Sequence, residues 1–417
     1  MMLVRVGRAA GRRGLLATNQ IFLSKAARIQ NQSSSSNAVR CVSSASSNNK
    51  KDEDNEEPVK ETAGEGSGTT DVNQVQDLID SSARGIGQVI FLNSPLSGGI
   101  LLTGWAISNP ILAGLGCLGV ITATATSRHV YAVDSSSWKD GLFGYNGALV
   151  GCAAGASLLV GPTSSITTGV AATVFGASVT PLVQSKLSQH VITKSPQWTY
   201  AFNFVTLSML GAANSLTALS DSSNGGSNGE VDTATIDTIT AAAAVTTTTP
   251  WMDVLVATPL VGISQIFLVE SAVSGSLITA GIATYSPGLA VHAIMGSAIG
   301  SAIGVGLWDV PLTDITNGLW GYNSALSSMA VGVFWTHSAS TVALSATSAG
   351  LTAVLFGAVS SSQLMGDLPC FTLPFCITMT ATHIVMRNAA VDGSKGIVPT
   401  LADAPHSPEQ NTTKIGE

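Results

Sequence analysis

Long runs of apolar and small residues without any charge alternate with short polar segments along the chain. No Asp, Glu, Lys or Arg occurs from Gly85 to Ser127, from Gly141 to Ser185, or from Ile315 to Gly366. Each run has room for two helices of about 20 residues, the length that crosses a bilayer. The runs mix Gly, Ala, Ser and Thr with Leu, Ile and Val, which suits helices packed closely on one another in lipid. The pattern predicts an all-α integral membrane protein.

A soluble protein with a buried helical core is the alternative. Helices around such a core need polar outer faces, and the uncharged runs offer none. Composition favours the membrane as well, because only 10% of the residues are charged, against about a quarter in soluble proteins.

The sequence also repeats itself, which points to two homologous halves. Gln88–Gly98 recurs as Gln265–Gly275 and Gly141–Leu149 recurs as Gly318–Leu326, both at an offset of 177 residues (318 minus 141), and Pro196–Phe202 recurs as Pro369–Phe375 at an offset of 173. Three matches in the same order make chance similarity an unsatisfactory explanation.

The first half has room for five membrane crossings. We expect them near Ile86–Ile107, Ile111–Ser127, Leu142–Val160, Ile166–Leu187 and Trp198–Leu219. An odd number per half makes the second half enter the bilayer with the opposite orientation. The prediction is therefore two inverted-topology five-helix repeats, about ten transmembrane helices in all, with the substrate path where the repeats meet.

The remaining segments connect or flank these repeats. We divide the chain into a basic Ser-rich tail (1–51), a disordered acidic spacer (52–80), the first repeat (81–220), a low-complexity linker (221–249), the second repeat (250–388) and a C-terminal tail (389–417). The first tail contains no acidic residue and resembles an organellar transit peptide. The alternative is a disordered basic tail on a plasma-membrane protein.

The repeated Gly-x-x-Gly-Tyr-Asn motif is the first candidate for a site. On a helix Tyr145 shares a face with Leu149, and Tyr322 shares one with Leu326. Two such faces across an axis would form a slot wide enough for a planar solute. Ordinary helix packing explains a single copy equally well.

Other chemistry has little support in the sequence. The five cysteines lie mainly inside apolar runs and include no CxxC pair, and the histidines are scattered. We expect no metal site, no cofactor and no nucleic-acid partner. A membrane-embedded hydrolase would need a nucleophile elbow or an HExxH motif. The sequence contains no HExxH, and its Gly-Gly-Ser-Asn-Gly229 run lies in the low-complexity linker and not between a strand and a helix.

At this point the sequence resembles the urea transporter family, the urea channels of animals and bacteria. The resemblance covers nearly all of 81–388 and rests on the repeated Gln and Gly-Tyr-Asn segments and on Leu368-Pro-x-x-Thr-x-Pro-Phe375. It implies ten spanning helices with two shorter tilted pore helices, and one pore in each protomer of a homotrimer. It also implies the residues of the urea pore, namely Gln88, Phe91, Tyr145, Leu149, Thr199, Gln265, Leu268, Tyr322, Leu326 and Thr372.

The chain departs from the family pattern at three places. Leu268 stands where the first half has Phe91, so one wall lacks a ring. Glu270 places a carboxylate at an expected intramembrane position, and ionisable groups inside a membrane usually have a function. Ala201 replaces the proline matched by Pro374, while the hydroxyl of Thr199 is kept.

The solute explains why such residues are needed. Urea is flat and neutral, and each of its N–H groups loses a hydrogen bond on leaving water. Side-chain and backbone oxygens can replace these bonds in sequence, and passage requires several weak sites. We expect passive, channel-like transport of urea across the lipid. The alternative is an ion-coupled secondary transporter of urea or a small amide, with Glu270 as its coupling group.

Overall fold

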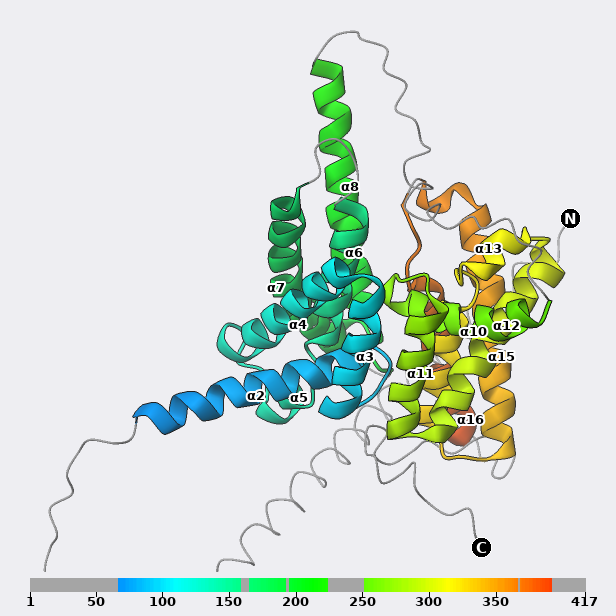
Figure 1. The fold of residues 1–417 in the computed structure, drawn as a ribbon, viewed down its shortest axis with the longest axis horizontal. Helices are drawn as coiled ribbons and strands as arrows, with labels where there is room; N and C mark the ends of the chain where they lie inside the picture. Colours follow the sequence, from blue (N-terminus) through cyan, green and yellow to red (C-terminus); the bar gives the residue numbers. More distant parts are fainter. Residues whose placement is uncertain (1–66, 159–164, 193–194, 224–250, 367, 392–417) are drawn as a thin grey trace, which may run out of the picture. The chain divides into compact units, whose positions relative to one another are not determined.

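The computed structural model describes residues 67–391 except 159–164, 193–194, 224–250 and 367, all within one compact unit of the chain (Figure 1). Its first helices are α2 Ser67–Gln88, α3 Pro95–Ser108, α4 Pro110–His129, α5 Ser135–Lys139, α6 Tyr145–Leu158, α7 Ile166–His190 and α8 Tyr200–Ser223. The later elements are α10 Trp251–Ser264, the 3₁₀ turn η1 Gln265–Phe267, α11 Ala272–Tyr285, α12 Pro287–Trp308, α13 Leu312–Thr316, α14 Tyr322–Phe334, α15 Ala339–Ser361, the 3₁₀ turn η2 Gln363–Met365 and α16 Leu373–Val391. Loops join these helices, and the described residues contain no β-strand.

The order of elements before the linker recurs after it. α2 to α8 correspond one by one to α10 to α16, with a short α5 or α13 in the middle of each set and a long helix at its end. The helix caps recur too, because Ser94 accepts from the Ser97 amide at 3.2 Å and Ser271 accepts from the Ser274 amide at the same distance. A serine side chain that accepts an amide hydrogen in this way starts a helix. The repeat seen in the sequence thus extends to local structure.

Packing within the first set of helices matches packing within the second. α4 lies against α6 and α7, and α12 lies against α14 and α15 in the same way. The two sets meet where α3 packs against α11, which Figure 1 shows side by side, and where α8 touches α16. A hydrogen bond between hydroxyl groups joins α3 to α11, since Ser108 Oγ lies 2.6 Å from Ser274 Oγ.

Four described helices are long and apolar enough to cross a membrane, namely α4, α7, α12 and α15. A fifth span results if Val256–Phe267 and Ala272–Tyr285, bent by 79°, count as one broken span. The predicted ten crossings are not confirmed by this test. One reason is length, because α6 has 14 residues and α14 has 13, and at about 1.5 Å per residue neither covers a core of about 30 Å.

Two sequence-based expectations differ from the structure. The crossing expected at Ile86–Ile107 is interrupted, because α2 ends at Gln88 and α3 begins at Pro95. The spacer expected to lack structure up to residue 80 is helical from Ser67 onward. The sequence of α2 is amphipathic, because Val72, Val75 and Ile79 recur at helical spacing among polar residues. These three side chains are exposed, and burial begins at Ser81. The basic tail, most of the linker and the C-terminal tail from residue 392 onward lie outside the described residues, and α16 continues to Val391, three residues into that tail.

Candidate functional site

Each repeat contains a helix break at a residue in the left-handed region. Phe91 has φ +68° just after α2, and Leu268 has φ +55° just after η1. A left-handed conformation costs a non-glycine residue about 1–3 kcal/mol and persists only where its surroundings hold it. Both residues stand at corresponding positions of the repeat. The departure at Leu268 therefore changes the side chain and leaves the backbone turn intact.

The glutamines before these breaks are held in the same way in both repeats. Gln88 Nε2 donates to the Asp140 carbonyl at 2.9 Å, and Gln265 Nε2 donates to the Asn317 carbonyl at 2.7 Å. Both side chains are buried. The donor end of each amide is bound to protein, so the oxygen is the end that can accept from a solute.

The glycines that open the Gly-x-x-Gly-Tyr-Asn motif allow the following loop to touch the first helix. Gly141 has φ +75°, and a Cβ on it would lie 2.4 Å from the Gly85 amide nitrogen. Gly318 has φ +81°, and its Cβ would lie 2.7 Å from the Gly262 amide nitrogen. Only glycine satisfies both requirements without strain.

The motif tyrosines fix the chain that leads to the threonines. Tyr145 Oη donates to the Trp198 carbonyl at 2.5 Å, and Tyr322 Oη donates to the Phe371 carbonyl at 2.5 Å. Both acceptor residues are left-handed, with φ +45° and +43°. The backbone before Thr199 therefore has the same turn as the backbone before its counterpart, although Ala201 replaces a proline.

Thr199 and Thr372 come together from the two repeats. Their Oγ1 atoms lie 2.7 Å apart, and each residue is 4% exposed. Two further side chains complete the cluster: Asn203 Nδ2 donates to Thr372 Oγ1 at 2.8 Å, and Cys376 Sγ lies 3.1 Å from Thr199 Oγ1. The two repeats thus contribute one threonine each to a single hydrogen-bonded pair.

Four aromatic rings gather beside this hydroxyl pair. Phe91 meets Trp198 and Phe334 edge-on, both with centroids 6.2 Å apart. Phe375 lies 6.1 Å from Phe91 and 5.5 Å from Trp198. Rings with perpendicular planes pack tightly and present edges as well as faces.

A cavity of about 660 Å³ opens next to the rings. Of the predicted pore residues its lining includes Gln88, Phe91, Tyr145 and Thr199. Trp198 and Gln184 also line it, as does Phe334 from the second repeat. At its outer part Asp134 accepts from the Ser136 hydroxyl and from the Ser137 amide, and these hydrogen bonds hold the pKa of the Asp134 carboxyl below its usual range.

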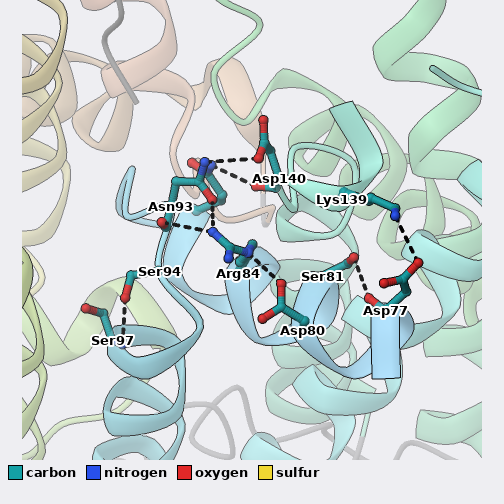
Figure 2. Close-up of polar contacts among 10 residues, drawn as sticks. Asp77, Asp80, Ser81, Arg84, Asn93, Ser94, Ser97, Lys139 and Asp140 are labelled. Carbon is teal, nitrogen blue, oxygen red and sulfur yellow. Dashed lines mark hydrogen bonds and ion pairs between the residues drawn. The ribbon is translucent and has the colours of Figure 1, made fainter. Parts of the chain in front are cut away.

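A polar network connects α2 to the wall of this cavity (Figure 2). Arg84 lies between Asp80, at 2.7 Å, and the Asn93 side-chain oxygen, at 2.8 Å. Asn93 Nδ2 donates in turn to the Asp140 carboxylate at 3.2 Å. Asp140 supplies the carbonyl that holds Gln88, so the network supports the position of that amide. In the second repeat Val261 stands where Arg84 stands in the first.

The other predicted residues lie outside the cavity lining. Leu149 and Leu326 are buried in the apolar core, and Leu268 packs against it. Glu270 lies in the break before α11 and its side chain is exposed. Within the described residues no group of three or more His, Cys, Asp or Glu is arranged to hold a metal ion.

Sequence reasoning missed several residues of this region. The match of Pro196–Phe202 to Pro369–Phe375 contained a signal for Trp198 and Phe375, because both are aromatic positions of the repeat. The same match pairs Asn203 with Cys376, one residue beyond its end. Phe334 belongs to no repeated segment, so nothing in the sequence marked it.

Comparison with known proteins finds relatives that match most of the chain, including the residues of this site. A family model described as urea transporter matches residues 79–387. Urea transporter 1 of Ovis aries is 30% identical over 314 residues, which cover 74% of this chain and 77% of the relative. Urea transporter 1 of Mus musculus is 29% identical, over 73% of this chain and 76% of the relative.

Proposed function

Because the chain belongs to the urea transporter family, a family of transporters and not of enzymes, we propose that it carries urea passively through a narrow pore between its two repeats. It is a multi-pass integral membrane protein, as its family and its long apolar helices indicate. The observation that carries the proposal is the cavity of about 660 Å³ beside the hydroxyl pair contributed by both repeats.

The chemistry of the cluster supports a neutral, planar, donor-rich solute. The amide oxygens of Gln88 and Gln265 and the hydroxyls of Thr199 and Thr372 are acceptors for N–H groups. Ring edges and faces around Phe91 favour a flat molecule over a bulky one. Several weak acceptors in sequence let the solute leave as readily as it enters.

The wider arrangement belongs to the same proposal. We assign the repeats to 81–220 and 250–388 with opposite orientations in the membrane, so that Tyr145, Leu149, Tyr322, Leu326 and Leu268 form the walls on either side of the pseudo-two-fold axis. We further propose a homotrimer in lipid, each protomer with its own pore. The basic tail, 1–51, would direct it to an organellar membrane, and without such targeting the plasma membrane is its location.

Urea flux into proteoliposomes made with the full chain tests the transport mode. We expect urea to equilibrate at the same rate with and without proton or sodium gradients, and never to accumulate. Accumulation that collapses on addition of an ionophore would contradict passive transport and favour coupling, with Glu270 the first residue to replace. No flux above that of protein-free liposomes would contradict urea transport itself.

A further inference from the structure

The surroundings of the threonine pair differ between the two repeats at one position. Asn203 follows Thr199 by four residues, and Cys376 follows Thr372 by four residues. Both side chains are fully buried and face the same pair of hydroxyls. A carboxamide therefore stands on one side of the pair and a thiol on the other.

The carboxamide of Asn203 has a determined orientation. Its Nδ2 lies 2.9 Å from the Thr199 carbonyl, which can only accept, so the NH₂ group must face that oxygen. Its second hydrogen reaches Thr372 Oγ1 at 2.8 Å. Asn203 Oδ1 is buried and accepts no hydrogen bond from the described residues.

These contacts favour one direction for the hydroxyl protons. Thr372 accepts from Asn203, and its own hydrogen can be donated to Thr199 Oγ1, which lies 2.7 Å away. Thr199 then donates to Cys376 Sγ at 3.1 Å. The reverse direction leaves the Thr372 hydrogen unpaired in a buried place, whereas the chosen direction leaves only the S–H, a weak donor.

We propose that Asn203 is a positioning residue that directs both hydroxyl protons away from the solute, so that the threonine pair offers urea only hydrogen-bond acceptors. Each hydroxyl keeps one free lone pair, and Asn203 Oδ1 adds a third acceptor. Selectivity for solutes rich in N–H groups follows, because a solute carbonyl finds no donor here. This role depends on the proposed urea path passing the threonine pair.

Urea and acetamide distinguish an acceptor-only site from an ordinary polar site. The two solutes are planar and have the same number of heavy atoms, but acetamide has a methyl group in place of one NH₂. We expect the full-length protein in proteoliposomes to carry urea faster than acetamide, after subtraction of flux through protein-free liposomes. A ratio of one or below overturns the proposal without any variant.

Two variants with opposite chemistry test the direction of the protons. Asn203→Leu removes the amide donor, and Cys376→Asn adds a second amide that donates to Thr199. Asn203→Leu removes the free acceptor Asn203 Oδ1, and in Cys376→Asn the new amide occupies the lone pair that Thr199 would offer to the solute. Each change removes one acceptor for a solute N–H, and urea has more N–H groups than acetamide, so both should lower the urea-to-acetamide ratio by about threefold to tenfold, the effect of one hydrogen bond. Cys376→Ser, which retains an acceptor for Thr199, should preserve the ratio.

The outcomes distinguish the positioning role of Asn203 from an effect on stability, and they test that role separately from urea transport itself. Fluxes are normalised to folded protein measured by size-exclusion chromatography, and if Asn203→Leu does not fold, Cys376→Asn provides the test. A ratio unchanged in the folded variants overturns the role of Asn203 while leaving urea transport intact. Absence of urea flux in the natural protein overturns the transport function instead.

Discussion

The hydroxyls of Thr199 and Thr372 are the closest polar contact between side chains of the two repeats near the cavity, at 2.7 Å. Replacing Thr372 with Val keeps the shape but removes the hydroxyl. A desolvated N–H of urea then lacks an acceptor at a cost of about 1–3 kcal/mol, and we expect flux per folded protein to fall by roughly tenfold. Stopped-flow measurement of urea entry into proteoliposomes checks this.

Thr352→Val is the matched control for that experiment. Thr352 is also fully buried and hydrogen-bonded, to Ser327 at 2.6 Å and to the Ser348 carbonyl at 2.8 Å, but it lies on α15 outside the cavity lining. Its loss should lower thermal stability and leave normalised urea flux unchanged. Equal flux losses in both variants would show that the threonine pair acts only through stability.

The sequence predicted the residue types of the site better than their partners. Gln88, Tyr145 and Thr199 were predicted from the repeated segments and from the family resemblance, and the structure places all three in the cavity lining. Their bonds to the Asp140 and Trp198 carbonyls were not predictable, since backbone acceptors depend on turns that have no side-chain signature. The same limit hid the contact between the two threonines, which are 173 residues apart.

At the scale of elements, the close contact between the Gly-x-x-Gly-Tyr-Asn loop and the first helix is the feature most sensitive to change. Gly141→Ala would place a Cβ 2.4 Å from the Gly85 amide nitrogen at φ +75°. The backbone of the loop and the backbone of α2 cannot easily move apart, so we expect the free energy of unfolding to fall by more than about 2 kcal/mol. A drop in the melting temperature of the purified protein measures this.

Gly99→Ala serves as the comparison, because Gly99 lies on α3 with no atom within 4 Å of its added Cβ and with no positive φ. There alanine favours the helix by roughly 0.5–1 kcal/mol. Opposite signs for the two substitutions are expected. Similar melting temperatures for both variants would mean that the loop adjusts to a side chain at Gly141.

Element boundaries were predicted closely where a helix starts at a marked residue and poorly where it breaks. Pro110 and Ile166 begin α4 and α7 within one residue of the predicted crossings. The interruption between Gln88 and Pro95 was missed, because Phe91 and Leu268 adopt left-handed turns that their residue types disfavour. Tertiary contacts, such as those of the rings around Phe91, must hold these turns in place.

At the scale of the whole molecule, all proposed pore residues come from a single chain. The cavity is lined by Gln88, Tyr145 and Thr199 of one repeat together with Phe334 of the other. Thr372 of the second repeat contacts Thr199 through its hydroxyl. A solute path built in this way needs no residue from another subunit. The proposed homotrimer should therefore contain three independent pores rather than one shared channel on its axis.

Mixing experiments distinguish three independent pores from one shared channel on the trimer axis. Natural protein and the Thr372→Val variant, co-expressed in known proportions and reconstituted together, form trimers of mixed composition. With independent pores urea flux should fall in proportion to the share of variant, to about half at equal mixing, whereas a shared axial pore that needs three natural subunits should leave about one eighth. Linear dependence is expected because each variant subunit closes only its own path. A steep, cubic loss would contradict a pore within each protomer and with it the assignment of the threonine pair to that pore.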